Sequence, residues 1–463
     1  MSGSPVESGV KMARSPSGLT QSLVDLATGN QGWPPSVMVV SRQCLLDWIG
    51  VTIAGATDRA IDHIVDEALD RGSSGRSTLI GRSERLSLLD AALANGVAGH
   101  ILDYDDAHQA IRGHGTAPIM PAVLAAAEAM ERTVGESLAA FACGYEACAR
   151  MGLMLGPTHY VRGFHTTATA GIFGAVVATA RLIGLDAEQT RHALGIAGTM
   201  SSGLVANFGS MCKALHAGRA ASSGLHAARL AARGFTSSHD AIEAANGFIN
   251  AVGGERRDEM ALKPPPSNYH LPDTLFKMHA SCYGTHSAII AALTARRRGV
   301  TPDKIVAIDV WVQPGAEQAC SIPSPTTGLQ AKFSLSYLVA MALCGLDTSD
   351  PESFPDTLPD RPEVTALAAR VSLHYPPDMA GMSARISLGL SDGSVVEESA
   401  DAGKPERDLA EQQDRLESKF RSLVESRLGS RKATRILEII NAPDKCPVAD
   451  LLETCRRRKL LGR

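Results

Sequence analysis

The sequence predicts a mainly α protein with a large helical domain and a smaller α+β domain. The chain has 463 residues, 44% of them hydrophobic and 20% charged, which is ample for two or three cores. Its first half is rich in Ala, with apolar residues at three- and four-residue steps that indicate amphipathic and buried helices. Short β-branched segments follow only after about residue 266.

The helical domain is predicted for residues 19–265. Its clearest helical segments are 37–54, 86–102, 121–139, 168–185 and 220–232. Residues 169–177 are apolar or small nearly all round, which indicates a helix inside a bundle. Residues 1–18 hold Ser, Gly and Pro instead of an apolar signal region and predict a disordered tail. We expect no stretch that approaches the ~20 apolar residues of a membrane span.

The α+β domain is predicted for residues 266–400, after a charge cluster at 255–259 and three consecutive prolines at 264–266. A β-branched segment at 304–312 predicts a strand, and Asp392-Gly393 between 384–388 and 394–397 predicts a hairpin. Segments 333–343 and 362–369 favour helices. Residues 401–463 return to a helical pattern, and we expect this tail to pack back on the helical domain.

Composition excludes several classes of function. The 45 Lys and Arg against 49 Asp and Glu give a net charge of −4, and aromatic residues are only 4%, so nucleic acid is not an expected partner. The nine cysteines contain no CxxC pair, which favours a reducing cytoplasm over a disulfide scaffold. Without a P-loop, a dinucleotide-binding glycine motif or HExxH, we predict no metal and no organic cofactor.

Four clusters place ionisable residues next to Gly and small residues. The first holds three acids in four positions, at 103–106, followed by Arg112 and His114. Burying these acids requires a cation or a proton, and the alternative is an exposed acidic helix end. The second places His165 and three threonines at the start of an apolar helix, where they could bind a carboxylate or only cap the helix.

The third cluster spaces Lys213, His216 and Arg219 three residues apart, on one face of a helix. It could bind carboxylates, or it could be a solvated basic face. The fourth contains Lys277, Cys282 and His286 near the domain crossing, where they could act as anion clamp, thiol and acid or base. Cys282 could equally be a small core residue, and His286 the polar end of an apolar stretch.

Together, these residues favour proton transfer on an acidic small molecule. Cys-His nucleophilic hydrolysis is a weaker alternative, because no GxSxG or comparable nucleophile turn occurs.

At these motifs the chain resembles the MmgE/PrpD family of 2-methylcitrate dehydratases and cis-aconitate decarboxylases. The matching stretches are LDYDDAH with RGHGTAPIMPA, GFHTTATAGIFGA, NFGSMCKALHAGRAA with GLHAARLAARGFT, KMHASCYGTH and AKFSLSY. The likeness runs from about residue 19 to 452.

The resemblance implies a helical domain built from both ends of the chain, a smaller lid domain, an active site in the cleft between them and a homodimer. It also implies work without metal or cofactor on di- and tricarboxylates. Carried over by motif position, the catalytic residues are Asp103, His114, His165, Lys213 and Lys277; substrate-binding residues are Arg112, His216, Arg219, Cys282, His286 and Tyr337.

Departures from the family pattern bear on the reaction. Ala107 stands where the family usually has Thr, and Gly115-Thr116 where it has Pro-Ser. Cys282 occupies a position that looks like a histidine in the animal decarboxylase. The Arg-Gly-His, Asn-Phe-Gly and Ser-Cys-Tyr stretches look most like the iminodisuccinate epimerase branch.

Our mechanistic hypothesis is that Lys213, Lys277, Arg112 and Arg219 neutralise substrate carboxylates while His165 and His114 serve as base and acid. Asp103 would orient or tune one of the histidines. A lyase acting on a 2-methylcitrate-, alkylcitrate- or aconitate-like acid ranks first. An epimerase or racemase of an aspartate-like or imino diacid ranks second, and a non-catalytic binding or assembly protein is the outside alternative.

Overall fold

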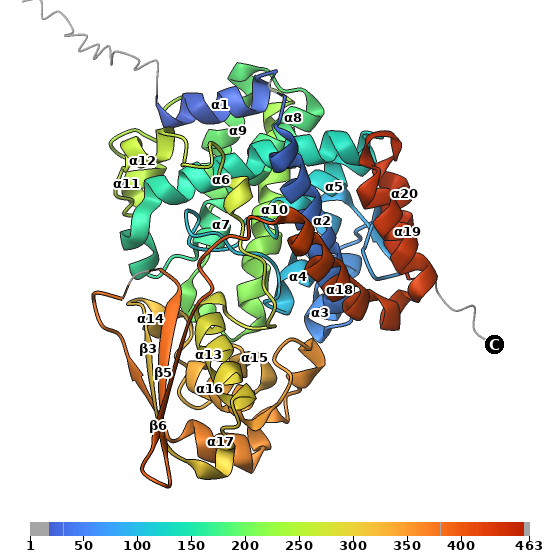
Figure 1. Ribbon diagram of the computed structural model, residues 1–463. Helices are drawn as coiled ribbons and strands as arrows, with labels where there is room; N and C mark the ends of the chain where they lie inside the picture. Colours follow the sequence, from blue (N-terminus) through green and yellow to red (C-terminus); the bar gives the residue numbers. More distant parts are fainter. Residues whose placement is uncertain (1–17, 31, 380, 458–463) are drawn as a thin grey trace, which may run out of the picture.

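The computed structural model describes residues 18–30, 32–379 and 381–457, and it is mainly helical (Figure 1). The tail predicted for 1–18 lies outside the described residues except for Gly18. The large part begins with these helices: α1 (Leu19–Thr28), α2 (Pro35–Gly55), α3 (Arg59–Asp70), α4 (Leu88–Ile101), α5 (Met120–Ala129), α6 (Val134–Val161), α7 (Thr166–Thr169), α8 (Gly171–Ile183), α9 (Ala187–Met200), α10 (Met211–Ala231), α11 (Phe248–Ala251) and α12 (Asp258–Leu262).

Two departures from the predicted helical part have local causes. The helix predicted for 121–139 is divided, because Glu131 adopts a left-handed φ of 53° and Thr133 starts a new helix. The Thr133 hydroxyl accepts from the Glu136 N–H while the Glu136 carboxylate accepts from the Thr133 N–H. The helical part also holds a small antiparallel ribbon, β1 (Ser77–Thr78) with β2 (Arg85–Leu86).

The expectation that no segment reaches membrane-span length is wrong. By length and composition alone, three helical segments are long and apolar enough to span a membrane: Pro35–Gly55, Val134–Val161 and Thr166–Ile183. Their apolar windows are 83%, 83% and 89% buried within this fold. Here these segments pack against neighbouring helices.

Glycines bring α4 and α10 into close contact. A Cβ added to Gly96 would lie 2.6 Å from the Cα of Gly218, and one added to Gly218 would lie 2.5 Å from the Leu93 carbonyl oxygen. Without side chains at the crossing, the two backbones approach closely. The crossing places the C-terminal end of α4 beside the N-terminal turns of α10, the two segments that carry most of the site.

The smaller part holds a four-stranded sheet covered on one face by helices (Figure 1). The sheet order is β4 (Val371–His374), β3 (Ile305–Val312), β5 (Ser383–Leu390) and β6 (Val395–Asp401), with β3 and β4 parallel and the other pairs antiparallel. The predicted hairpin is β5–β6, with Leu388 opposite Val396. The helices of this part are α13 (His286–Arg297), α14 (Ala316–Ala319), α15 (Gly328–Ala331), α16 (Leu335–Cys344) and α17 (Pro362–Ala368).

The last helices lie beside the large part (Figure 1). They are α18 (Leu409–Leu428), α19 (Ser430–Asn441) and α20 (Val448–Cys455), and α18 packs along α2. Lys419 of α18 is buried, lies 2.7 Å from Asp47 of α2, and donates to the carbonyls of Tyr104 and Lys277 at 2.8 and 2.9 Å. This ammonium group therefore ties two segments of the site to α18.

Candidate active site

The acidic cluster after α4 turns into the protein instead of facing solvent. Asp103 adopts a left-handed φ of 50° directly after Leu102, the C-cap of α4, and this redirects the chain. Asp103, Asp105 and Asp106 are all buried. The alternative of an exposed acidic helix end is therefore excluded, and each carboxylate must find a partner.

Two lysines from distant segments converge on Asp103. Lys213 Nζ at the start of α10 and Lys277 Nζ each donate to Asp103 Oδ1 at 2.9 Å, and Lys277 also donates to the Asp103 carbonyl at 2.8 Å. Burial alone favours the neutral acid, but the two ammonium groups hold the pKa of Asp103 well below its usual range. Asp103 is consequently a carboxylate at neutral pH, and two cations are anchored beside it.

Asp105 lies between two imidazoles. Its Oδ1 is 2.9 Å from His100 Nδ1, and its Oδ2 is 2.8 Å from His114 Nδ1. Lys213 donates to His100 Nε2 at 2.9 Å, so His100 carries its proton on Nδ1 and donates it to Asp105. Burial lowers the pKa of His100 to about 4 and lowers that of His114 despite the neighbouring carboxylate. Both rings are therefore neutral near pH 7.

Asp106 forms hydrogen bonds that hold the surrounding chain in place. It accepts from the Thr116 N–H at 3.2 Å and from the Tyr145 hydroxyl at 3.1 Å. Burial and the neighbouring Asp105 raise its pKa to about 7. The three acids therefore differ: one binds lysines, one binds histidines and one holds the surrounding chain.

His165 reaches the same region from the start of α7. It is 2% exposed, and its Nδ1 lies 3.0 Å from Nδ1 of His216 on α10. Burial and the positive charge of Lys213 lower the pKa of His165 well below its usual range. The ring of Phe208 stands edge-on to it, with centroids 4.9 Å apart.

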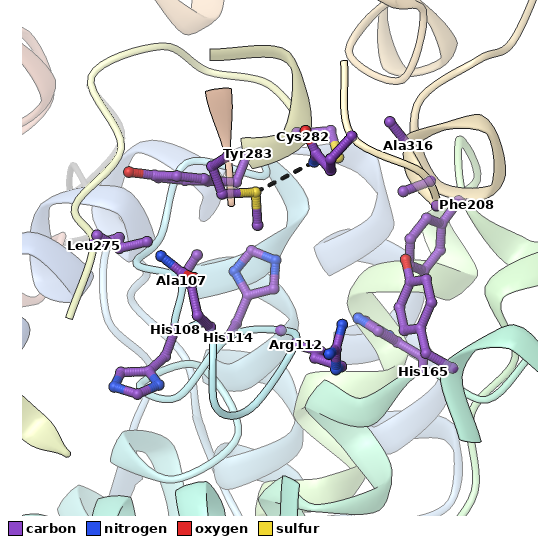
Figure 2. A pocket seen from close by; sticks show the side chains of 18 of the residues that line it. Ala107, His108, Arg112, His114, His165, Phe208, Leu275, Cys282, Tyr283 and Ala316 are labelled. Atoms are coloured by element: carbon purple, nitrogen blue, oxygen red, sulfur yellow. Dashed lines mark hydrogen bonds between the residues drawn. The ribbon is translucent and has the colours of Figure 1, made fainter. Parts of the chain in front are cut away.

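These groups open on a cavity of about 410 Å³ between the large and small parts (Figure 2). The large part contributes Asp103, Arg112, His114, His165 and Lys213. Across from them lie mainly apolar groups, Leu275, Cys282, Tyr283 and Ala316, and Met382 also lines the cavity. A cavity of this size with one polar wall and one apolar wall suits a small, charged organic molecule.

The cations at the cavity exceed the carboxylates. The Arg112 guanidinium forms no ion pair or hydrogen bond with another described side chain or backbone group, and Arg112 adopts a left-handed φ of 54° on the loop before His114. With Lys213 and Lys277 it opposes only Asp103 and Asp105. One positive charge is therefore left for an anionic ligand.

Two groups of side chains have metal-ligand spacing among the described residues. In the cavity group, His100, Asp103, Asp105 and His114, the lysine ammonium groups occupy Asp103 Oδ1 and His100 Nε2, and His100 Nδ1 carries the ring proton. In the surface group, Glu188, His192 and His239, the His192 Nδ1 accepts from the Ser237 N–H, which puts the ring proton on Nε2. Neither group offers a complete set of free lone pairs, and the absence of a metal stays a prediction.

Comparison with known proteins agrees with this geometry. The sequence model of the MmgE/PrpD N-terminal domain matches residues 27–261, and that of the MmgE/PrpD C-terminal domain matches residues 279–445. The chain belongs to the MmgE/PrpD family. The resemblance inferred from the motifs is therefore confirmed.

Relatives of this MmgE/PrpD protein include cis-aconitate decarboxylases of animals and fungi. The enzyme of Mus musculus is 28% identical over 405 residues, covering 82% of this chain and 81% of the relative. The enzyme of Homo sapiens is 28% identical, covering 86% of each chain. That of Aspergillus terreus is 27% identical, covering 90% of this chain and 94% of the relative. These matches support a lyase of the MmgE/PrpD type.

Several predicted site residues of this MmgE/PrpD protein do not line the cavity. Arg219 is exposed on α10, because it lies on the far side of the helix from Ala220 and Ala221 in the core. The Tyr337 hydroxyl donates to the Leu358 carbonyl at 2.7 Å, inside the smaller part. His286 is buried behind Tyr283, with the rings stacked at 4.7 Å. None of these three residues lines the cavity, and their contact with a substrate stays a prediction.

Two other predicted site residues contact residues that line the cavity instead of lining it themselves. His216 contacts His165 instead of the cavity, and Lys277 is fully buried behind Asp103. Cys282 does line the cavity, and its thiol is hydrogen-bonded to Cys320, which lowers the pKa of Cys282.

Sequence reasoning missed three residues of this site. His100 lies one helical turn before Asp103, and that spacing was an available signal. Asp105 stood in the acidic motif but was not assigned a role. Lys332, in the AKFSLSY stretch, is buried and donates to the Leu102 carbonyl at 2.8 Å, which fixes the end of α4 from the smaller part.

Proposed function

We propose that this protein is a lyase that decarboxylates a small tricarboxylate of the cis-aconitate type. The observation that carries the proposal is the convergence of Lys213, His114 and His165 on one cavity, with Lys277 and Asp103 fixing their surroundings. The decarboxylase relatives support the same reaction.

Cations of the cavity bind the substrate. Lys213 and Arg112 line it, and ammonium and guanidinium groups pair with carboxylates through charge-assisted hydrogen bonds. The polar wall thus holds the carboxylates, while the apolar wall around Leu275, Ala316 and Met382 excludes water from the carbon chain.

The imidazoles supply the proton. When the C–C bond to a carboxylate breaks, its electron pair shifts into the neighbouring carbon framework, CO₂ leaves and a proton must be added to carbon. Of the three histidines that line the cavity, His108 has both ring nitrogens bonded to backbone groups, which leaves His165 and His114 as proton donors. Because these rings are neutral in the free protein, the donor must receive a proton on its second nitrogen as it gives one to carbon. Nearby lysines stabilise the carbanion-like charge that develops before protonation.

Four acids separate the reaction classes: cis-aconitate, citrate, 2-methylcitrate and iminodisuccinate. We expect release of CO₂ from cis-aconitate in buffered D₂O, with one deuterium on carbon in the product. A new alkene absorbance from citrate or 2-methylcitrate without CO₂ would identify a dehydratase instead. Arg219→Gln is the matched control, because Arg219 lies on the same helix as Lys213 but outside the cavity.

An epimerase is the second candidate. It is favoured by two imidazoles, His114 and His165, which reach the cavity from different elements and could serve opposite faces of one carbon. Deuterium uptake into recovered iminodisuccinate with neither CO₂ nor alkene would select it.

A further inference from the structure

The contact between His165 and His216 joins two like nitrogens. Their Nδ1 atoms are 3.0 Å apart, and both side chains are buried. One Nδ1 must therefore donate and the other accept. Because a neutral imidazole carries one proton, this choice fixes whether the second nitrogen of His165, Nε2, carries a hydrogen.

His216 lies behind His165 and beneath a surface loop. The loop passes directly over the His216 ring, since a Cβ on Gly203 would lie 3.4 Å from His216 Cγ, and the Gly203 carbonyl accepts from the His165 N–H at 3.0 Å. Ser202 and Leu204 on either side of Gly203 are exposed. The pair thus runs from the cavity wall toward the surface without passing through the cavity.

The charge of the ligand decides which nitrogen donates. Lys213 and Arg112 make the cavity suited to an anion, and a lone pair on His165 Nε2 would repel a carboxylate there, whereas an N–H would bind it. The favourable arrangement has the His216 Nδ1–H donating to His165 Nδ1.

We propose that His216 is a positioning residue that holds the proton of His165 on Nε2, toward the cavity, and supplies a proton to that ring during turnover. The role of His216 as a proton source during turnover rests on the proposed decarboxylation. Its role in holding the tautomer of His165 does not.

The proton balance is closed by water. As the C–C bond breaks and CO₂ leaves, the new C–H bond takes the His165 Nε2 proton, and the shared proton moves from His216 Nδ1 to His165 Nδ1. His165 therefore never becomes an imidazolate, and His216 takes a proton from water on Nε2. After product release, water protonates His165 Nε2, the shared proton moves back from His165 Nδ1 to His216 Nδ1, and His216 Nε2 gives its proton back to hydroxide, so both rings return to their starting tautomers. One proton per turnover comes from solvent, as decarboxylation requires.

Nitrogen NMR of the full chain labelled with [¹⁵N]histidine tests the tautomer without any substrate. The His165 signals are those lost in His165→Gln. We expect a pyridine-type Nδ1 and a pyrrole-type Nε2 at pH 7 in the wild type, and a shift of the His165 signals in His216→Leu. His226→Leu, on the same helix, is the matched control and should leave them unchanged. A pyrrole-type Nδ1 on His165, or His165 signals that do not respond to His216→Leu, would overturn the proposal.

Activity measurements test whether His216 supplies a proton to His165 during turnover. We expect CO₂ release from cis-aconitate to fall about 10²-fold in His216→Leu, the low end of an acid–base contribution. His216→Asn should restore the His165 tautomer in the nitrogen spectrum but little of the rate, because its amide N–H donates a hydrogen bond without giving up the proton. A rate recovered in His216→Asn would overturn the relay, since holding the tautomer would then suffice. Equal rates in His216→Leu and the wild type overturn the relay. A wild type that releases no CO₂ overturns the proposed function and the relay with it, while NMR alone decides the tautomer.

Discussion

At the scale of single residues, Asp103 is the organising group of the site. Its Oδ1 accepts from both Lys213 and Lys277, and its backbone adopts a left-handed conformation that Asp tolerates better than most residues. The carboxylate neutralises part of the lysine charge, which would otherwise be costly to bury. Asp103 thereby holds a cation, Lys213, at the cavity wall.

Replacing Lys213 with Met tests the carboxylate clamp. The change removes the ammonium group but keeps a similar volume, and we expect kcat/KM for cis-aconitate to fall about 10²–10³-fold through lost charge stabilisation. Steady-state kinetics measure this, and Arg219→Gln on the same helix should keep wild-type values. Equal kinetics in Lys213→Met and wild type would remove the clamp from the mechanism.

Replacing His114 with Gln tests the acid–base role of the imidazole beside Asp105. The amide keeps polar contacts but does not titrate, so we expect kcat to fall about 10²–10⁴-fold in a folded protein. Circular dichroism and a thermal melt verify folding. Turnover near the wild-type rate would assign the proton transfer to another group.

At the scale of elements, the α4–α10 crossing assembles the site. The close approach at Gly96 and Gly218 brings His100 and Asp103, at the end of α4, within hydrogen-bond distance of Lys213. Helical periodicity predicted both helices, and the Lys213–His216 spacing was visible in sequence. The crossing itself was not, because nothing local in either segment reports which glycines face each other.

Adding one methyl group at this crossing should disturb both stability and activity. In Gly218→Ala the new Cβ meets the Leu93 carbonyl at 2.5 Å, and overpacking of this kind typically costs about 1–3 kcal/mol. We expect a lower Tm together with reduced kcat/KM, measured by calorimetry and kinetics. Gly184→Ala is unsuitable as a control because its φ is 73°, whereas Gly32→Ala has open space around the new Cβ. An unchanged melt and unchanged kinetics in Gly218→Ala would contradict the role of the crossing.

At the scale of the whole molecule, the site combines residues from both parts of the chain. Motif reasoning found Asp103, His114, His165, Lys213 and Lys277, since charged residues beside glycines are a local signal. It assigned substrate contact to Arg219 and Tyr337, because sequence spacing does not show which side of a helix faces the cavity. Assembly as a homodimer and a cytoplasmic location stay predictions.

Buried histidines should make the whole fold sensitive to mild acid. Burial lowers their pKa, to about 4 for His100, His216, His270 and His279, whereas in the unfolded chain they titrate near 6.5. As the pH falls from 6.5 toward 4 the unfolded chain binds protons that the folded protein does not, so the free energy of unfolding decreases. For a fully buried ring such as His100 the slope is up to about 1.4 kcal/mol per pH unit.

Three buried acids oppose this trend, and burial also raises the pKa of Asp47. The pKa values of Asp106 and Glu146 are raised by burial to about 7, so the folded protein binds their protons first and gains stability as the pH falls. The histidines outnumber them, and we expect a net fall in Tm between pH 7 and pH 5 by calorimetry. A Tm that rises over this range would show that the histidines are not held neutral.

The most direct measurement for the central claim is a crystal structure with tricarballylate, a saturated tricarboxylate that has no double bond to rearrange. We predict its carboxylates within hydrogen-bond distance of Lys213, Arg112 and His165, with the carbon chain against Leu275 and Met382. Tricarballylate bound elsewhere on the protein, or a cavity left empty at saturating ligand, would contradict the account.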